Sequence, residues 1–211
     1  MYVGRIVSIG KTLSGKLTAM YRVSSRSFPN REAKVLSGTV AILPKPGFED
    51  DIHKNPYIAY NCLRTTNVYG IVSNGTHTDH IANKLSAGQN MRDALVGVLH
   101  NMDFEHDALD TPRIAAVVDR ERGDGWLGIV RRDALHVRSF ELSPGTAFYV
   151  ATYEHNVPCA HYKDADFEVK DASAACRYVI GGGVFADFER PITAACLVTT
   201  DDGWDVAVAD A

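Results

Sequence analysis

The stretch Ile192-Thr193-Ala194-Ala195-Cys196-Leu197-Val198 is apolar along nearly its whole length. A strand with one face in water alternates apolar and polar residues, whereas a strand covered on both faces reads as a continuous apolar run. The stretch therefore predicts a strand buried on both sides, as happens when two sheets pack together beneath helices.

Helices and strands are distributed unevenly around this stretch. Further strands are predicted at residues 2–9, 17–24, 35–43, 57–63, 68–72, 113–118, 126–130, 135–140, 147–153 and 204–208. Helices are predicted at about 77–87, 91–102 and 172–180, and Asn90 is placed to cap the second of them. Because the helices cluster instead of alternating with strands, we predict an α+β fold of packed antiparallel sheets with helices outside. We expect one domain over residues 1–211.

Composition narrows the class of partner. The 211 residues include 45% hydrophobic and 23% charged side chains, which is ordinary for a globular protein that buries a core without disulfides or metals. The 22 basic and 26 acidic side chains give a formal net charge of -4. This balance argues against a nucleic acid polymer as partner, whereas a small anionic ligand needs only a local basic cluster.

The cysteines indicate a reducing environment. Cys62, Cys159, Cys176 and Cys196 form no C-x-x-C pair, and three of them lie in apolar contexts. We interpret them as free thiols and not as a disulfide scaffold or a zinc site. The sequence shows no basic-then-apolar leader and no run that approaches a membrane span. We therefore expect a cytoplasmic protein with no membrane partner, and the apolar strands leave a homo-oligomer open.

A basic cluster stands out in the stretch Tyr21–Arg31, which reads YRVSSRSFPNR. Its candidate site residues are Arg22, Ser25, Arg26, Asn30 and Arg31. An alternating pattern leads into the stretch, so a strand is expected to deliver these side chains to its end. Guanidinium groups are fork-shaped donors suited to phosphate or carboxylate oxygens. The pattern indicates an anion-binding site, and a solvated surface loop or ion pairing is the alternative.

The segment Tyr60-Asn61-Cys62 places polar and reactive side chains inside a predicted strand. Since side chains alternate along a strand, Tyr60 and Cys62 share one face and Asn61 points to the other. A buried tyrosine hydroxyl needs a partner, and near an arginine it can act as an acid. Cys62 is a nucleophile or a small buried thiol, and the lack of a histidine paired with it in sequence favours the buried thiol.

Two further polar segments are candidates. The segment His77-Thr78-Asp79-His80 invites a metal site, but its histidines lie three apart, whereas a helical zinc pair is usually four apart. We favour a helix start or a ligand contact by His77, with no metal. The segment Asp103–Asp107 follows the second helix, where acidic groups oppose the helix dipole. We select Glu105 as a buried carboxylate because Phe104 precedes it, and a solvated loop is the alternative.

Five blocks of the sequence carry a family resemblance. They are Tyr21–Arg31 (YRVSSRSFPNR), Asn55–Cys62 (NPYIAYNC), Val72–Asp79 (VSNGTHTD), Thr111–Ala115 (TPRIA) and Thr152–Glu154 (TYE). Together they closely resemble the archaeal type of IMP cyclohydrolase. The likeness extends over nearly the whole chain, from the opening Met-Tyr-Val-Gly-Arg to the closing Gly-Trp.

The resemblance implies a fold and a reaction. The implied fold is a four-layer αββα sandwich of two antiparallel sheets flanked by helices, similar to the N-terminal-nucleophile hydrolases but without their processed nucleophile, since Tyr2 follows Met1. The implied reaction is the last step of purine synthesis, in which 5-formamidoimidazole-4-carboxamide ribonucleotide loses water and closes to inosine monophosphate. This chemistry requires an aimed amide nitrogen, a donor at the formyl oxygen and a proton source for the departing water. No cofactor is implied.

On this resemblance we assign roles to individual residues. Tyr60 is the donor or acid at the formyl oxygen, and Arg31 lowers the cost of negative charge there. Glu105 holds or deprotonates the carboxamide nitrogen, and Asn61 fixes the base or the amide. The substrate-binding candidates are Arg22, Ser25 and Arg26 for the phosphate with Arg113 in reserve, together with Asn30, Cys62, Asn74, His77 and Glu154.

Two other functions stay open on the sequence. An amide hydrolase would use Cys62 and would be inactivated by thiol alkylation. A purine-nucleotide sensor would bind through the arginine cluster and would need neither Tyr60 nor Glu105. An assay with the formylated ribonucleotide, following new purine absorbance, distinguishes the three.

Overall fold

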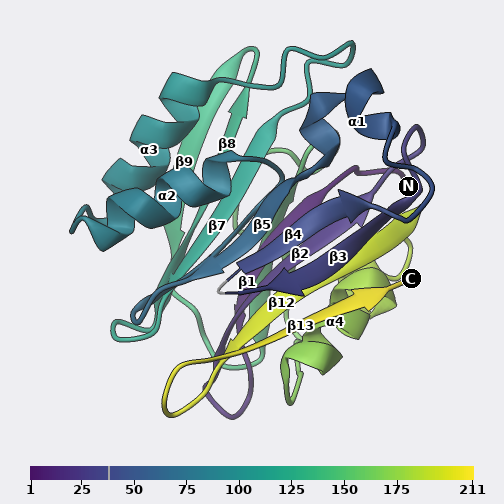
Figure 1. Ribbon diagram of the computed structural model, residues 1–211. Coiled ribbons are helices and arrows are strands. Elements are labelled where there is room, and N and C mark those ends of the chain that lie inside the picture. Colours follow the sequence, from purple (N-terminus) through teal and green to yellow (C-terminus); the bar gives the residue numbers. More distant parts are fainter. Residues whose placement is uncertain (38) are drawn as a thin grey trace.

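Two antiparallel sheets lie face to face at the centre of the molecule (Figure 1). The computed structural model describes residues 1–37 and 39–211. Within these residues the strands form one six-stranded and one seven-stranded sheet, and every strand pairing is antiparallel. The predicted α+β arrangement of packed antiparallel sheets is confirmed.

The six-stranded sheet contains the first and last strands of the chain. In spatial order its strands are β11 (Lys163–Asp164), β10 (Thr146–Ala151), β1 (Ile6–Lys11), β2 (Leu17–Ser24), β12 (Pro191–Thr199) and β13 (Trp204–Asp210). Strand β12 contains the apolar stretch that predicted burial on both faces. Its Ala195 and Leu197 pack between the sheets, whereas Ala194 and Cys196 pack beneath a helix on the outer face.

The seven-stranded sheet follows chain order. Its strands are β3 (Arg31–Leu36), β4 (Thr39–Pro44), β5 (Tyr60–Thr65), β6 (Tyr69–Ser73), β7 (Arg113–Asp119), β8 (Asp124–Arg131) and β9 (Ala134–Phe140). The hairpin predicted around residues 65–67 is confirmed as β5 and β6. The prediction of a single strand over 35–43 is wrong. This range contains the end of β3 and most of β4, which pair with each other as a hairpin, and position 38 between them lies outside the described residues. Strand β3 is an exposed edge strand rich in charge, so its apolar pattern is weak.

Helices cover the outer faces of both sheets (Figure 1). In the described part of the chain they are α1 (Asp51–Lys54), α2 (His77–Ser86), α3 (Met91–Met102) and α4 (Ala172–Gly181), with 3-10 turns η1 (Pro56–Ile58) and η2 (Gly183–Phe185). Helices α2 and α3 pack on the seven-stranded sheet, and α4 packs on the six-stranded sheet. These three helices confirm the predicted ones, and Asn90 caps α3 by accepting from the Asp93 backbone N at 2.9 Å. Each helix falls short of the length and apolarity that crossing a membrane requires, over the residues described.

The stretch Tyr21–Arg31 connects the two sheets. It begins in β2 of one sheet and ends at the first residue of β3 in the other. The connection turns tightly, because Ser25 Oγ accepts from the Phe28 backbone N at 3.0 Å and Arg31 Nε donates to the Phe28 carbonyl at 3.1 Å. The turn carries Arg31 into the space between the sheets, where its side chain is buried.

Arg22 has a structural task, which removes it from the candidate phosphate ligands. Its guanidinium donates to Ser24 Oγ and to the carbonyl oxygens of Val179, Ile180, Phe185, Phe188 and Glu189. Several of these carbonyls lie at the C-terminal end of α4 and in the turn that follows, where a helix leaves acceptors without intrahelical partners. Arg22 therefore ties β2 to the end of α4, and all three guanidinium nitrogens are occupied.

Replacing Arg22 with leucine should destabilise the fold, because several buried carbonyl oxygens would lose their donor. We expect the free energy of unfolding to fall by about 3–5 kcal/mol in urea denaturation. Arg26→Leu is the matched control. Arg26 lies on the same segment but is exposed, and its 3.4 Å contact with Glu189 is an exposed ion pair, so its loss should change the stability much less. Equal losses in the two variants would contradict the structural task of Arg22.

Candidate active site

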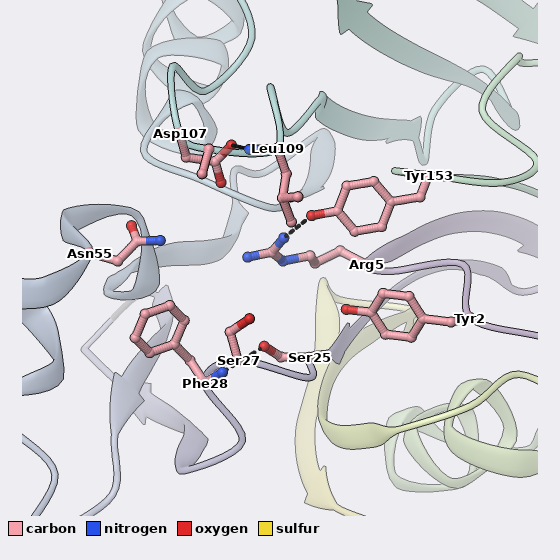
Figure 2. A pocket seen from close by; sticks show the side chains of 10 residues that line it. Tyr2, Arg5, Ser25, Ser27, Phe28, Asn55, Asp107, Leu109 and Tyr153 are labelled. Atoms are coloured by element: carbon pink, nitrogen blue, oxygen red, sulfur yellow. Dashed lines mark hydrogen bonds between the residues drawn. The ribbon is translucent and has the colours of Figure 1, made fainter.

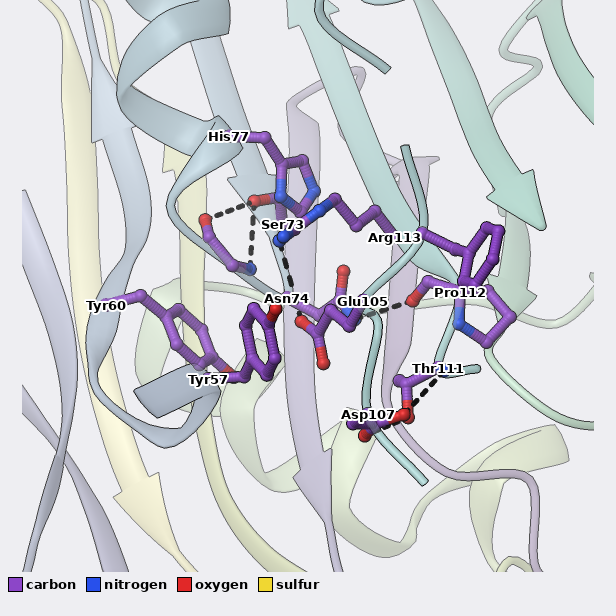
Figure 3. Close-up of polar contacts among 12 residues, drawn as sticks. Tyr57, Tyr60, Ser73, Asn74, His77, Glu105, Asp107, Thr111, Pro112 and Arg113 are labelled. Carbon is purple, nitrogen blue, oxygen red and sulfur yellow. Dashed lines mark hydrogen bonds and ion pairs between the residues drawn. The ribbon is translucent and has the colours of Figure 1, made fainter. Parts of the chain in front are cut away.

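Charged and polar side chains are buried together where strands of both sheets begin or end near the α3–β7 loop. Figure 3 shows four of them, Tyr60, His77, Glu105 and Arg113. The members of this buried cluster are Arg5, Tyr21, Arg31, Tyr60, His77, Glu105 and Arg113, and each is between 0% and 7% exposed. Charged side chains are rarely buried to this degree unless they are paired. The cluster therefore needs an explanation beyond packing.

Many polar atoms of the buried cluster have no hydrogen-bond partner among the described residues. They are Arg5 Nε, both Nη atoms of Arg31, His77 Nδ1, both Oε atoms of Glu105, and Nε and Nη1 of Arg113. Leaving a buried polar group unpaired costs about 1–3 kcal/mol, so native proteins rarely gather several in one place. Donors and acceptors concentrated in this way suit a small polar ligand that carries both kinds of group.

Glu105 is the acidic member of the cluster and is 1% exposed. Burial raises the pKa of its carboxyl from 4.5 to about 7, although the nearby Arg5 and Arg113 guanidinium groups oppose the rise. Its Oε1 lies 3.6 Å from Arg113 Nη1, which is longer than a charge-assisted hydrogen bond. A carboxyl with a pKa near neutral can both take up and release a proton under ordinary conditions.

The α3–β7 loop holds Glu105 by a compact set of hydrogen bonds. The Glu105 backbone N donates to the Thr111 carbonyl at 2.8 Å. The Asp107 carboxylate accepts from the Thr111 backbone N at 2.9 Å and from Thr111 Oγ1 at 2.7 Å (Figure 3). Thr111 Oγ1 also lies 3.0 Å from the hydroxyl of Tyr153. Glu105 was selected from the sequence because Phe104 precedes it. In the structure, however, the hydrogen bonds of the loop hold Glu105 in place, and Phe104 does not explain them.

Tyr60 and Tyr21 face each other across the space between the sheets. Their hydroxyl oxygens are 2.6 Å apart. Burial raises the pKa of Tyr60, and the guanidinium groups of Arg31 and Arg5 oppose that rise because they favour negative charge on its oxygen. Arg31 keeps both Nη atoms available for such an interaction, since among the described residues only its Nε makes a hydrogen bond.

Arg5 is a site residue that our sequence reasoning missed. Its backbone N donates to Thr152 Oγ1 at 3.1 Å, and its Nη1 donates to the Tyr153 hydroxyl at 3.4 Å. The preceding Gly4 has a φ of +78°, and a Cβ there would lie 2.0 Å from Thr152 Oγ1, so only glycine brings the backbone this close. The available signal was a lone arginine in the otherwise apolar opening strand.

An open pocket shares Arg5 with the buried cluster, and Figure 2 shows the side chains that line it. Its lining residues are Tyr2, Arg5, Ser25, Ser27, Phe28, Asn55, Asp107, Ala108, Leu109 and Tyr153. The pocket has a volume of about 290 Å³, at the lower end of small-molecule sites. The candidate Ser25 is one of these lining residues. Arg26 lies beside the pocket, with its guanidinium 4.2 Å from the ring centre of Tyr2.

Asn74 and His77 fasten the turn before α2 to the start of β7. Asn74 Nδ2 donates to the Pro112 carbonyl at 2.9 Å, and its Oδ1 accepts from the Ile114 backbone N at 2.8 Å. Both ends of the Asn74 amide are therefore engaged in placing the strand that carries Arg113. His77 Nε2 lies 2.9 Å from the Ile114 carbonyl, and burial lowers the pKa of His77 to about 3. His77 is thus neutral, donates from Nε2, and presents Nδ1 as an acceptor.

Two candidates on β5 are not brought to the cluster with Tyr60. Asn61 points to the opposite face, as alternation predicts, and its Nδ2 donates to Asp79 Oδ2 of α2 at 2.9 Å. Cys62 lies on the Tyr60 face but is fully buried in the apolar core between the sheets. Burial raises the pKa of its thiol, which disfavours the reactive thiolate.

The remaining candidates lie outside the cluster and the pocket lining. Asn30 is half-buried, and its carbonyl accepts from the Lys45 backbone N at 3.0 Å. Glu154 is exposed, although the adjacent Tyr153 lines the pocket. Over residues 1–37 and 39–211, His, Cys, Asp and Glu side chains form no group of three or more able to hold a metal ion.

The fold and the cluster define an α+β protein with a buried, cation-rich site of the kind that accommodates a small anionic molecule. A family model described as IMP cyclohydrolase-like protein matches residues 2–203, and the chain belongs to that family. Relatives named IMP cyclohydrolase support this. One from Methanosphaera stadtmanae is 44% identical over 98% of both chains, and one from Methanocaldococcus jannaschii is 42% identical over 98% of both. A third, from Methanocella arvoryzae, is 44% identical over 99% of this chain and 98% of its own. The predicted family resemblance is confirmed.

Glu105→Gln should stabilise the protein at alkaline pH. A carboxyl whose pKa is raised on folding contributes stability that is present below its unfolded pKa and is lost as the pH rises through 7. Glutamine carries no charge, so the variant avoids that loss. In urea denaturation we expect the variant to exceed the unmodified protein by on the order of 2 kcal/mol at pH 8 and by little at pH 5. Glu141→Gln, at an exposed carboxyl, should show no such pH dependence. A Glu105→Gln advantage equal at both pH values would refute the raised pKa.

Proposed function

We propose that this chain is an IMP cyclohydrolase, which converts 5-formamidoimidazole-4-carboxamide ribonucleotide to inosine monophosphate and water. Its family and the names of its relatives support this proposal. The observation that carries it is the burial of Tyr60, Arg31 and Glu105 in one cluster, since ring closure needs an acid, a cation and a base around one reacting centre.

In the first step the carboxamide nitrogen attacks the formyl carbon. A new C–N bond forms, and the electron pair of the C=O bond moves to the formyl oxygen. The nitrogen loses a proton to the Glu105 carboxylate, and the oxygen gains a proton from the Tyr60 hydroxyl. Arg31 lies close enough to Tyr60 to favour negative charge there, which is the charge that this transfer creates.

In the second step water leaves and the ring becomes unsaturated. The hydroxyl formed in the first step departs as water after it takes up a second proton, and the formamido nitrogen loses its proton. Protonated Glu105 and the Tyr60 phenolate are the acid and base that the first step leaves behind. A transfer from Glu105 and a transfer to Tyr60 therefore balance the reaction and restore both groups.

The substrate is a ribonucleotide, and the site offers distinct surroundings for its two ends. We place the reacting base in the buried cluster, with Arg113 and His77 Nδ1 as further polar contacts. The 5′-phosphate then lies in the open pocket near Ser25, with Arg26 beside it. A phosphate there would replace the exposed contact between Arg26 and Glu189.

The layer order supports a finer description of the fold. Helix α4, the six-stranded sheet, the seven-stranded sheet and the α2–α3 pair follow one another through the molecule (Figure 1). We propose that this is the αββα sandwich of the N-terminal-nucleophile hydrolases, used here for a different reaction. A role in purine synthesis also agrees with a cytoplasmic location.

The competing functions have less support. A hydrolase using Cys62 would need an accessible thiolate, whereas Cys62 is fully buried among apolar side chains. A nucleotide sensor would bind the ribonucleotide without consuming it. The decisive experiment incubates the purified protein with the formylated ribonucleotide and follows purine absorbance and product identity. Binding without formation of inosine monophosphate would favour the sensor and overturn the enzyme.

Tyr60→Phe should lower turnover by about 100-fold or more, because a positioned acid contributes at least that factor. Affinity for inosine monophosphate should change only a few fold, since the ring of residue 60 remains in place. The measurements are kcat and product binding by calorimetry. Cys62→Ala is the control on the same face of the same strand and should keep nearly full activity. Unchanged turnover in Tyr60→Phe would remove the acid from the mechanism.

The pH profile should report Glu105 as the base. Because the carboxylate is the active form and its pKa is about 7, kcat/KM should fall as the pH drops below 7. Glu105→Gln should lose this acid limb together with most of its activity. Asp103→Asn, at an acidic residue of the same loop, should retain the limb. Full activity in Glu105→Gln would exclude proton abstraction by this residue.

A further inference from the structure

Tyr21 is a member of the buried cluster that ring closure leaves without a task. It lies on β2 of the six-stranded sheet, whereas Tyr60 lies on β5 of the seven-stranded sheet. The 2.6 Å contact between their hydroxyls therefore joins the two sheets at the reacting group. The two residues differ slightly in exposure, since Tyr60 is 6% exposed and Tyr21 is 0% exposed.

The direction of this hydrogen bond follows from counting hydrogens. Each hydroxyl carries one hydrogen, and the shared bond uses only one of them. If Tyr60 donated, the hydrogen of Tyr21 would be buried with no other acceptor in the part of the chain that the structure describes. Such a group carries an appreciable desolvation penalty. If Tyr21 donates, the remaining hydrogen belongs to Tyr60, whose side chain retains some access to the site. Tyr21 is therefore the donor.

We propose that Tyr21 is a positioning residue, which holds the Tyr60 hydroxyl with its hydrogen directed at the substrate oxygen and then stabilises the Tyr60 phenolate. This inference rests on the proposed function, because it concerns the acid of that reaction. Tyr21 itself touches no substrate and transfers no proton.

The proton balance of the step involves Tyr60 alone. Its O–H bond breaks, a new O–H bond forms on the former formyl oxygen, and the electron pair remains on the Tyr60 oxygen. The hydrogen bond from Tyr21 then points at an anion instead of a neutral hydroxyl, and such charge-assisted bonds are about twice as strong. Tyr21 thus stabilises the state after proton transfer more than the state before it, which is the condition for accelerating the step.

The surrounding charges agree with this order of ionisation. Burial raises the pKa of Tyr21 well above its usual value, and the neighbouring Tyr60 raises it further, although Arg5 and Arg31 oppose the rise. Burial also raises the pKa of Tyr60, but Arg31, Arg5 and the hydrogen bond from Tyr21 all oppose that rise. Tyr60 is therefore the first of the pair to give up its proton.

The test is Tyr21→Phe, which removes the hydroxyl and keeps the ring. We expect kcat to fall about 10–100-fold, the range for one hydrogen bond to a charged group. We expect KM to stay within about twofold, because the Tyr21 side chain is not accessible. At alkaline pH kcat should fall as Tyr60 loses its proton. In the variant this alkaline limb should move to higher pH, since the Tyr60 phenolate loses a hydrogen-bond donor. A merely structural task would not move that limb.

Two further variants separate a specific from a general effect. Tyr149→Phe removes another buried phenol of the same sheet, whose hydroxyl lies 2.9 Å from His155 Nδ1, and should leave kcat and the limb in place. Adding Tyr21→Phe to Tyr60→Phe should cost less than about twofold, because the partner is already gone. An undiminished loss in the double variant, or an unchanged kcat and limb in Tyr21→Phe, would overturn the inference.

If Tyr21→Phe does not fold, the inference can be tested by incorporating 3-fluorotyrosine at position 21. The fluorinated phenol is a more acidic and stronger donor of nearly the same size, so the alkaline limb should move to lower pH. An unmoved limb there would also contradict the inference. If the unmodified protein forms no inosine monophosphate at all, the proposed function itself fails. Normal turnover together with an indifferent position 21 would overturn the inference about Tyr21 alone.

Discussion

The structure depends on burying charge between two sheets that are otherwise packed with apolar side chains. Arg5, Arg31, Glu105 and Arg113 all lose their water, and a single unpaired charge in such a place would be strongly unfavourable. The burial is tolerable for the group as a whole, because the guanidinium groups oppose the rise in the pKa of Glu105 and of Tyr60. The same attraction between opposite charges also stabilises the buried arginines. The rigid sheets prevent the charges from rotating out to solvent. The packing of the two sheets therefore holds these charged side chains together, away from solvent.

Position along the strands explains why these groups meet. Arg5 precedes β1, Arg31 begins β3, Tyr60 begins β5 and Arg113 begins β7. Since the two sheets pack face to face, residues at neighbouring strand ends are close in space although they are distant in sequence. The turn from Ser25 to Asn30 links the two sheets through the backbone, and the hydrogen bond between Tyr21 and Tyr60 links them through side chains. The geometry at Tyr60 thus depends on how the sheets are stacked, because its hydroxyl is hydrogen-bonded to a residue of the other sheet.

The sequence predicted features that depend on neighbours along the chain. The buried strand β12, the Asn90 cap and the two faces of β5 follow from local spacing, and each is found as expected. The site depends on contacts between distant segments, which spacing does not encode. Arg22 and Arg31 look alike within one stretch. The guanidinium of Arg22, however, donates to carbonyls at the end of α4 and beyond it, whereas two nitrogens of Arg31 have no hydrogen-bond partner among the described residues. Arg5 carries no local motif, because its position follows from the approach of Gly4 to Thr152. Glu105 was selected for its aromatic neighbour, whereas the loop around Thr111 is what buries it.

The unpaired atoms of the cluster connect stability with activity. Each of these atoms costs free energy when no partner meets it, so the cluster contributes less to the stability of the fold than apolar side chains in the same space would. A ligand that presents matching donors and acceptors removes those costs on binding, and the protein recovers the difference as affinity. In the proposed reaction, part of this recovery would come only when the formyl oxygen becomes negative, since Arg31 and the tyrosine pair would interact more strongly with an anion than with a carbonyl. On that proposal, the same groups that make the free protein less stable would favour the transition state over the substrate, which is the condition that catalysis requires.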